Sequence, residues 1–284
     1  MADPRPDPMV SVAWLAERLD APDIRIIDAS WHMPAEIRDP RAEYDERRIP
    51  GAIFFDIDEI ADTSTDLPHM LPSSEKFASR MRKLGIGDGA RIVVYNHEGI
   101  MTAGRVWWTF RAMGHDDVYV LDGGFPAWEA AKLPIETGLP LAHGERHFTV
   151  QRRGDLVRDV SDVRRVIDAK SATILDARPA ARFTGETPEP RAGLRGGHMP
   201  GATSVPSSTL VANGFLKSRE ELEKIFADKT GNFRQPIICT CGSGVTAAII
   251  ALALARLGRW DASVYDGSWT EWGGLADTPV VTGA

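Results

Sequence analysis

The sequence predicts an α/β protein made of two homologous domains, each a mainly parallel sheet flanked by helices. Three observations predict this: a globular composition, apolar strand-like runs that alternate with helix-like segments, and one internal repeat. The 284 residues are enough for two domains of roughly 150 residues each. Hydrophobic residues make up 43% and charged residues 26% of the chain, which argues against a largely disordered protein.

Charge and cysteine content argue against several classes of protein. Lys and Arg number 33 against 40 Asp and Glu, so the net charge is −7 and no nucleic-acid partner is expected. Cys239 and Cys241 are too few for a disulfide framework, and the second Cys or His pair of a zinc site is missing, so we expect no metal. The longest apolar stretch, Val245–Leu254, is about half a membrane span, and the first residues have no apolar run of signal-peptide length. We therefore expect a soluble cytoplasmic protein without a membrane partner.

The first part of each half contains the same series of elements. An apolar run ends in Asp at Ile24–Asp28 and again at Ala172–Asp176, and a Pro-Gly-Ala turn follows each run. A helix-like segment comes next, at Ser73–Leu84 in the first half. In the second half it begins at Ser218, which has capping-box spacing to Glu221.

The second part of each half is also repeated. An apolar run from Arg91 or Pro236 leads through a short polar loop to a Thr-Ala pair that opens a helical pattern. One separation, 144 residues, relates three pairs of residues: Thr102 and Thr246, Asp122 and Asp266, and Trp128 and Trp272. At that separation His97 occupies the place of Cys241. The chain is therefore a duplication, and we expect domains at 1–140 and 155–284, joined through 133–154, with a ligand cleft between them.

The segment Ile237–Thr246 predicts a nucleophile. It runs from an apolar strand into a helix, the place where parallel sheets bind ligands. Gly242 and Gly244 let the backbone curl, so several N–H groups can converge on one point beside the positive end of the helix dipole. This environment favours the thiolate of Cys241. Cys239 lies at the end of the apolar run and is expected to be buried and inert, and the pair is spaced more tightly than a redox Cys-x-x-Cys.

The loop Cys-Gly-Ser-Gly-Val-Thr, the segment DARPAARFTGETPEPR before it and the repeated Pro-Gly-Ala and Asp-Gly markers resemble the tandem rhodanese-domain sulfurtransferases over nearly the whole chain. The loop is similar to that of the 3-mercaptopyruvate branch, because the thiosulfate branch carries Arg-Lys in place of Gly242 and Ser243. The resemblance implies two rhodanese-like domains, the first catalytically silent. It also implies that Cys241 takes sulfur from 3-mercaptopyruvate as a persulfide, releases pyruvate, and passes the sulfur to a small thiol, thioredoxin or cyanide. No cofactor is needed.

The resemblance also assigns roles to individual residues. Arg182 and Arg191 are expected to hold the substrate carboxylate, because a guanidinium binds a carboxylate bidentately. Ser243 is expected to form a proton relay with His69 and Asp58, although the segment around His69 can equally be an interdomain packing element. The remaining residues predicted to bind the substrate or the persulfide are Gly242, Gly244, Val245, Thr246 and Trp31; for Trp31, ordinary packing is an equal alternative.

Other functions stay open at this point. A thiosulfate:cyanide sulfurtransferase would use the same scaffold, but the doubly anionic donor favours the extra positive charge of Arg-Lys. A non-catalytic sulfur carrier or binding module would use the same cleft. A tyrosine phosphatase is disfavoured, because the sixth residue after Cys241 is Ala247 and not the arginine that would bind phosphate.

Overall fold

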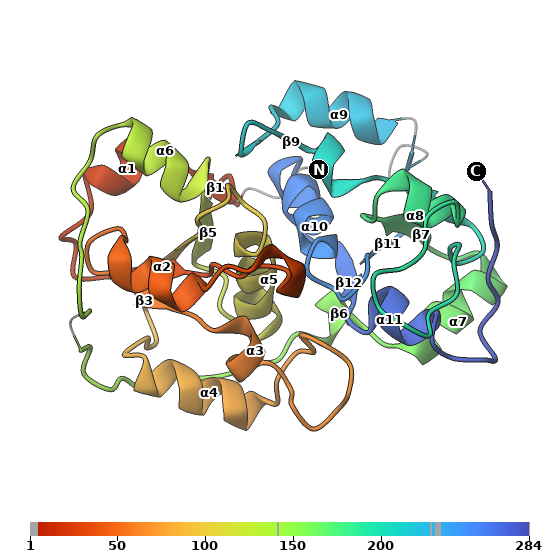
Figure 1. The fold of residues 1–284 in the computed structure, drawn as a ribbon, viewed down its shortest axis with the longest axis horizontal. Coiled ribbons are helices and arrows are strands. Elements are labelled where there is room, and N and C mark those ends of the chain that lie inside the picture. Colours follow the sequence, from red (N-terminus) through yellow and green to blue (C-terminus); the bar gives the residue numbers. More distant parts are fainter. Residues whose placement is uncertain (1–4, 141, 228, 231–233, 284) are drawn as a thin grey trace.

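The computed structural model describes residues 5–140, 142–227, 229–230 and 234–283, and these form two α/β halves (Figure 1). Each half has a five-stranded sheet, in the order β1-β5-β4-β2-β3 and β6-β12-β11-β7-β8, and all neighbouring strands are parallel. The strands are β1 (Met9–Val10), β2 (Ile24–Asp28), β3 (Ile53–Phe54), β4 (Arg91–Tyr95), β5 (Val118–Leu121), β6 (Val157–Arg158), β7 (Thr173–Asp176), β8 (Ala202–Ser204), β11 (Ile237–Thr240) and β12 (Ser263–Tyr265). A short antiparallel pair, β9 (Val211–Ala212) and β10 (Phe215–Leu216), lies outside both sheets. The predicted fold class is confirmed.

Helices cover the sheets, and their starts follow local capping rules. Ser73 caps the helix that follows it by accepting a hydrogen bond from the N–H of Lys76 at 3.2 Å. Ser218 and Glu221 form the predicted reciprocal pair at 3.0 and 3.3 Å. The α-helices are α1 (Val12–Ala16), α2 (Pro40–Glu46), α3 (Ile57–Ile60), α4 (Ser74–Lys83), α5 (Ala103–Ala112), α6 (Gly124–Ala130), α7 (Val160–Ala169), α8 (Ala180–Thr184), α9 (Arg219–Ala227), α10 (Ala247–Arg256) and α11 (Ser268–Trp272), with 3-10 turns at η1 (Pro34–Glu36), η2 (Gly154–Leu156) and η3 (Ser207–Thr209).

None of the helices in the described part of the chain is both long and apolar enough to cross a membrane.

The stretch predicted to join the two domains also belongs to the first one. Phe148 is only 4% exposed, and its ring packs edge-to-face against Phe77 and Phe110 at 5.5 and 6.1 Å. The backbone N–H of Asp88 donates a hydrogen bond to the carbonyl of His147 at 2.9 Å. The sequence pattern did not reveal this packing, because a single aromatic residue in an irregular segment has no periodicity.

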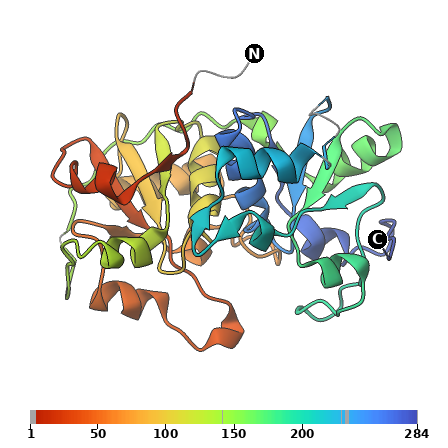
Figure 2. The same ribbon diagram turned by 90° about the horizontal axis from the view of Figure 1, so that it is seen from above.

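The two halves meet through α5 and α10, which lie at the centre of the molecule (Figures 1 and 2). All ten residues of α5 are buried, as is expected for a helix that packs on its own sheet and on a second helix. One hydrophobic core includes residues of both halves. The helices approach closely at Gly104, where an added Cβ would lie 3.5 Å from Cγ1 of Ile249. This contact fixes how the loops at the carboxyl ends of the two sheets face one another.

The close approach at Gly104 predicts that the stability of the protein depends sharply on the size of the side chain at position 104. Gly104→Ala is expected to be at least as stable as the wild type, because 3.5 Å is ordinary van der Waals contact and alanine favours the helix over glycine. Gly104→Leu is expected to lower the free energy of unfolding by roughly 1–3 kcal/mol, since the added atoms overpack the helix crossing. Urea unfolding of both variants measures the difference. Equal stability of the two variants would mean that this crossing does not hold the halves together.

Candidate functional site

A cavity of about 110 Å³ opens beside Cys241, where β11 ends and the chain turns into α10. Cys241 is only 2% exposed, because its own loop wraps around it, but it lines this cavity. Both halves contribute to the lining: Trp31, Met33, Glu36, Glu98, Met101 and Thr102 from the first, and Arg182, Pro190, Arg191, Cys241, Gly242, Ser243, Val245 and Thr246 from the second. The predicted nucleophile thus lies at an interdomain cavity.

Hydrogen bonds hold three backbone carbonyl groups of the Cys241 loop, those of residues 241, 242 and 244. The N–H of Trp269, in the first turn of α11, donates to the Cys241 carbonyl at 2.9 Å, and the N–H of Thr270 donates to the Gly242 carbonyl at 2.9 Å. The Gly244 carbonyl accepts a bond from Arg105 at 3.3 Å. In a trans peptide the following N–H points the opposite way, and the described residues contain no cis peptide.

The N–H groups of this loop are therefore free. No acceptor within the described ranges pairs with the backbone N–H groups of residues 242–246. Gly242, Ser243 and Val245, whose N–H groups are opposite the three fixed carbonyls, all line the cavity. Several unpaired donors at the start of α10 make a cradle for an anion centred on Cys241.

Gly244 provides the backbone curl that is expected of the loop glycines. It does not line the cavity, and its φ of +75° is the left-handed conformation that glycine adopts most easily. A Cβ there would lie 2.9 Å from the Arg105 guanidinium. Gly244 thus shapes the loop from behind, whereas Val245 and Thr246 line the cavity as predicted.

Ser243, His69 and Asp58 are brought together across the two halves. His69 Nδ1 lies 3.1 Å from Ser243 Oγ, and His69 Nε2 lies 3.1 Å from Asp58 Oδ1. Hydrogen bonding to His69, helped by a bond from Trp31, lowers the pKa of Asp58 below its usual value. His69 and Asp58 stand behind Ser243 rather than in the cavity wall. The arrangement keeps an ionised carboxylate behind the imidazole.

Trp31 both walls the cavity and holds His69 and Asp58 in place. Its Nε1 donates to Asp58 Oδ2 at 2.8 Å, and its ring meets the His69 ring edge-on at a centroid distance of 4.9 Å. The tryptophan therefore restricts the orientation of both groups.

Arg182 and Arg191 converge over the loop. A Cβ on Gly242 would lie 3.3 Å from Nη2 of Arg182 and 3.9 Å from Nη1 of Arg191. Among the described residues no carboxylate pairs with Arg191, although the residue is half-buried. A side chain at position 242 would make a tight contact with the Arg182 guanidinium. An unpaired arginine in a cavity favours an anionic ligand.

Sequence reasoning missed the group that holds Arg182. Glu189, with a side chain only 1% exposed, accepts from Arg182 Nε at 3.2 Å and from Arg178 Nη1 at 2.8 Å. Arg178 also forms a bidentate pair with the buried Asp176 and stacks on Trp269 at 4.1 Å. Together with Arg191, three cations face two carboxylates. The cluster therefore has one net positive charge beside the cradle.

Cys239 behaves as expected for a core residue. It is fully buried in β11, and burial raises the pKa of its thiol far above the ordinary value. The two cysteines form no disulfide.

His97 fills the corresponding place in the first half. The His97 ring stacks on Phe125 at 4.4 Å, and its Nε2 lies 3.2 Å from Asp28 Oδ2. The backbone N–H of His97 donates to Ser30 Oγ at 3.0 Å. A packed imidazole therefore occupies the position of the thiol.

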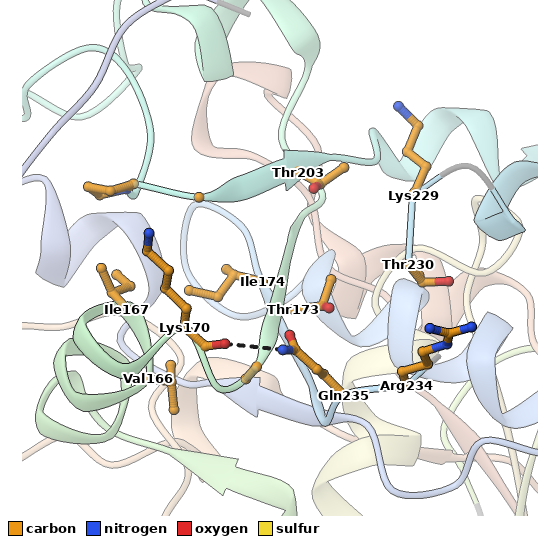
Figure 3. A pocket seen from close by; sticks show the side chains of 13 residues that line it. Val166, Ile167, Lys170, Thr173, Ile174, Thr203, Lys229, Thr230, Arg234 and Gln235 are labelled. Carbon is orange, nitrogen blue, oxygen red and sulfur yellow. Dashed lines mark hydrogen bonds between the residues drawn. The ribbon is translucent and has the colours of Figure 1, made fainter. Parts of the chain in front are cut away.

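Two other places in the molecule are weaker candidates for a site. His32, Glu36 and Glu98 could present metal-ligand atoms within 4.8 Å of one another, but Arg38 already pairs with Glu98, and His32 pairs with Glu43 at 2.8 Å. A larger cavity of about 640 Å³ lies between α7, β7 and β8 (Figure 3). Its lining has no cysteine, and Figure 3 shows Lys170 on one side and Arg234 on the other, without convergence on one point. The chemistry is assigned to the cavity at Cys241.

Comparison with known proteins agrees with this fold. A family model described as a rhodanese-like domain matches residues 11–131 and 159–275. The 3-mercaptopyruvate sulfurtransferase of Escherichia coli K12 is 45% identical over 273 residues, which cover 95% of this chain and 96% of that protein. The thiosulfate sulfurtransferase of Rattus norvegicus is 42% identical over 272 residues, covering 93% and 91%. The crystal structure of SseA from Escherichia coli superposes with a TM-score of 0.85 at 42% identity, covering 92% of this chain and 98% of that one.

The chain therefore belongs to the rhodanese family, with two copies of the domain.

The unequal surroundings of the two cysteines predict selective alkylation. Iodoacetamide at pH 8 is expected to modify Cys241 and to leave Cys239 unmodified, because a raised pKa keeps the buried thiol protonated at this pH. Peptide mass mapping of the native protein measures this, and Cys241→Ser is the control that should remain unlabelled. Label on Cys239 of the folded protein would show that the core around β11 opens readily.

Proposed function

We propose that this protein is a sulfurtransferase that takes sulfur from 3-mercaptopyruvate on Cys241, releases pyruvate and passes the sulfur to an acceptor. One observation supports it above the others: the Cys241 side chain shares its cavity with free backbone donors and with an arginine that has no carboxylate partner in the described chain. The cavity thus combines a nucleophile with binding groups for a small carboxylic acid.

The first half-reaction is a displacement at sulfur. The Cys241 thiolate attacks the sulfur of 3-mercaptopyruvate, so that an S–S bond forms and the C–S bond breaks. The electron pair of the C–S bond goes to carbon as the enolate of pyruvate. The thiol proton of the donor is lost and the enolate carbon gains one, which leaves pyruvate and an anionic Cys241 persulfide. The free N–H groups of the loop stabilise this anion.

Ser243, His69 and Asp58 handle the proton. Ser243 is two residues after the nucleophile, lines the cavity and bonds to His69 at 3.1 Å. The ionised Asp58 stabilises positive charge on His69, which passes a proton through the Ser243 hydroxyl.

In the second half-reaction a thiolate or cyanide attacks the outer sulfur, the S–S bond breaks, and the Cys241 thiolate leaves while the acceptor keeps the sulfur as a persulfide or thiocyanate. A small thiol, thioredoxin or cyanide can act as the acceptor in this scheme, and no metal or redox cofactor takes part. The cytoplasm remains the expected compartment; a relative in Arabidopsis thaliana is mitochondrial by name.

The charge of the cavity favours 3-mercaptopyruvate over thiosulfate as donor. The cluster made of Arg178, Arg182, Arg191, Asp176 and Glu189 has one net positive charge. This charge matches the single carboxylate of the 2-oxo acid. Glu98 in the cavity wall is paired with Arg38, whereas Glu36 adds negative charge that disfavours a dianion. Gly242 and Ser243 contribute no compensating cation.

A persulfide on one cysteine tests the proposed function. After treatment with 3-mercaptopyruvate, the intact mass is expected to rise by ~32 Da, located on Cys241, with release of one equivalent of pyruvate. Cys241→Ser is expected to show no mass gain and no pyruvate release. Cys239→Ala is the matched control, which should show the mass gain and release pyruvate.

Two outcomes would support the alternatives. A higher kcat/KM for thiosulfate than for 3-mercaptopyruvate would assign the protein to the thiosulfate reaction. Binding of 3-mercaptopyruvate without pyruvate release, unchanged in Cys241→Ser, would indicate a non-catalytic binding module.

Arg191 is predicted to bind the donor carboxylate. Arg191→Met is expected to raise KM for 3-mercaptopyruvate roughly tenfold to a hundredfold, the value of one or two lost charge-assisted hydrogen bonds. Steady-state pyruvate release measures the change. The control is Arg165→Met, which removes an exposed arginine paired with Asp162. Equal KM values in the two variants would remove Arg191 from the substrate site.

A further inference from the structure

The Asp-Gly markers of the repeat connect the two halves. Asp266, only 4% exposed, accepts a hydrogen bond at 2.7 Å from the backbone N–H of Leu71, a residue of the first half. Its other oxygen pairs with Arg105 Nη1 at 2.7 Å. Arg105 comes from the first turn of the interface helix α5 and is 1% exposed. The buried carboxylate therefore attaches a loop and a helix of the first half to the domain that carries Cys241.

The Arg105 guanidinium also binds two carbonyl groups of the site. Its Nη2 donates to the carbonyl of His69, and its Nη1 donates to the carbonyl of Gly244 at 3.3 Å. Its planar face lies on the Trp108 ring at 4.5 Å. One rigid, buried group thus touches the backbone of the relay histidine and the backbone of the nucleophile loop at the same time.

The backbone at His69 requires such support. His69 has a φ of +60°, a left-handed conformation that is unfavourable for residues other than glycine and persists where neighbouring contacts enforce it. The contacts come from both sides, since Arg105 holds the carbonyl of His69 and Asp266 holds the N–H of Leu71. This conformation directs the imidazole toward Ser243 Oγ, 3.1 Å away.

Asp122, the Asp-Gly marker of the first half, makes a similar connection between the halves, away from the Cys241 loop. Asp122 accepts from the backbone N–H of Leu216 at 3.0 Å and pairs with Arg256 Nη2 at 3.4 Å. Arg256 binds the carbonyls of Leu216 and Lys217 at 3.0 and 3.1 Å. Each marker Asp therefore binds a loop of the opposite half together with an arginine. Only the Asp266 connection touches the nucleophile loop and the relay histidine.

We propose that Arg105, held by Asp266, is a positioning residue that sets the separation of His69 from the Cys241 loop across the domain interface. This role rests on the proposed function in one respect: the relay must serve pyruvate release. Arg105 touches neither the cavity nor the reacting atoms. It acts through the two backbone segments that it joins.

Kinetics of three variants test the role. Arg105→Met is expected to lower kcat for pyruvate release roughly tenfold to a hundredfold, with little change in KM, because a displaced relay weakens the chemical step. Arg105→Lys keeps the charge but cannot reach both carbonyls and Asp266 together, so it is expected to lower kcat as well. Arg256→Met removes the corresponding interdomain pair and is expected to retain wild-type kcat. Equal loss of kcat in Arg105→Met and Arg256→Met would overturn the proposal.

A double-mutant cycle separates positioning from general loss of stability. In a His69→Ala background, Arg105→Met is expected to lower kcat little further, because the group that it positions is already absent. If the double variant loses kcat by the full product of the two single losses, Arg105 does not act through His69.

A crystal structure of Arg105→Lys gives a readout that does not depend on activity. We expect His69 Nδ1 and Ser243 Oγ to have moved beyond hydrogen-bond distance. An unchanged contact would overturn the positioning role, whatever the enzyme's donor. Absence of pyruvate release by the wild type, combined with a displaced His69 in the variant, would instead overturn the proposed function and leave the positioning role standing.

Discussion

The site depends on three backbone carbonyls being held at the rear of one loop. The first turn of α11 binds the carbonyls of Cys241 and Gly242, and Arg105 binds that of Gly244. Trans peptide geometry then directs the N–H groups of the following residues away from these partners. The dipole of α10 adds to their effect. A thiolate or persulfide at this point therefore gains stabilisation from donors that were already oriented when the chain folded.

Duplication produced two similar scaffolds with different tasks. The second half presents the nucleophile on its loop, while the first half has the packed ring of His97 in that place. The first half instead contributes Asp58 and His69, which meet Ser243 across the interface. Neither half holds the complete set of groups. The packing of α5 against α10 therefore also brings together the residues of the proposed proton relay.

Much of this could be predicted from residue order. The strand Ile24–Asp28 and the cap at Ser218 rest on local rules, so the sequence located them within a residue. Arg182 and Arg191 were singled out from a contiguous recognisable segment, and both line the cavity. Glu189 and Arg105 were not found as site residues. Their importance comes from contacts with other segments, which leave no periodic or motif signal in the chain.

The sequence by itself determined the two α/β halves, their pairwise correspondence and the identity of the loop that carries Cys241, because these follow from local periodicity and from glycine positions. Only the tertiary structure decided how His69 reaches Ser243, why Gly244 stands behind the loop, and that Arg105 joins both. The physical reason is that these features depend on distances between segments far apart in the chain. Those distances are set by buried helix packing and by a shared ion pair, and no local propensity encodes them.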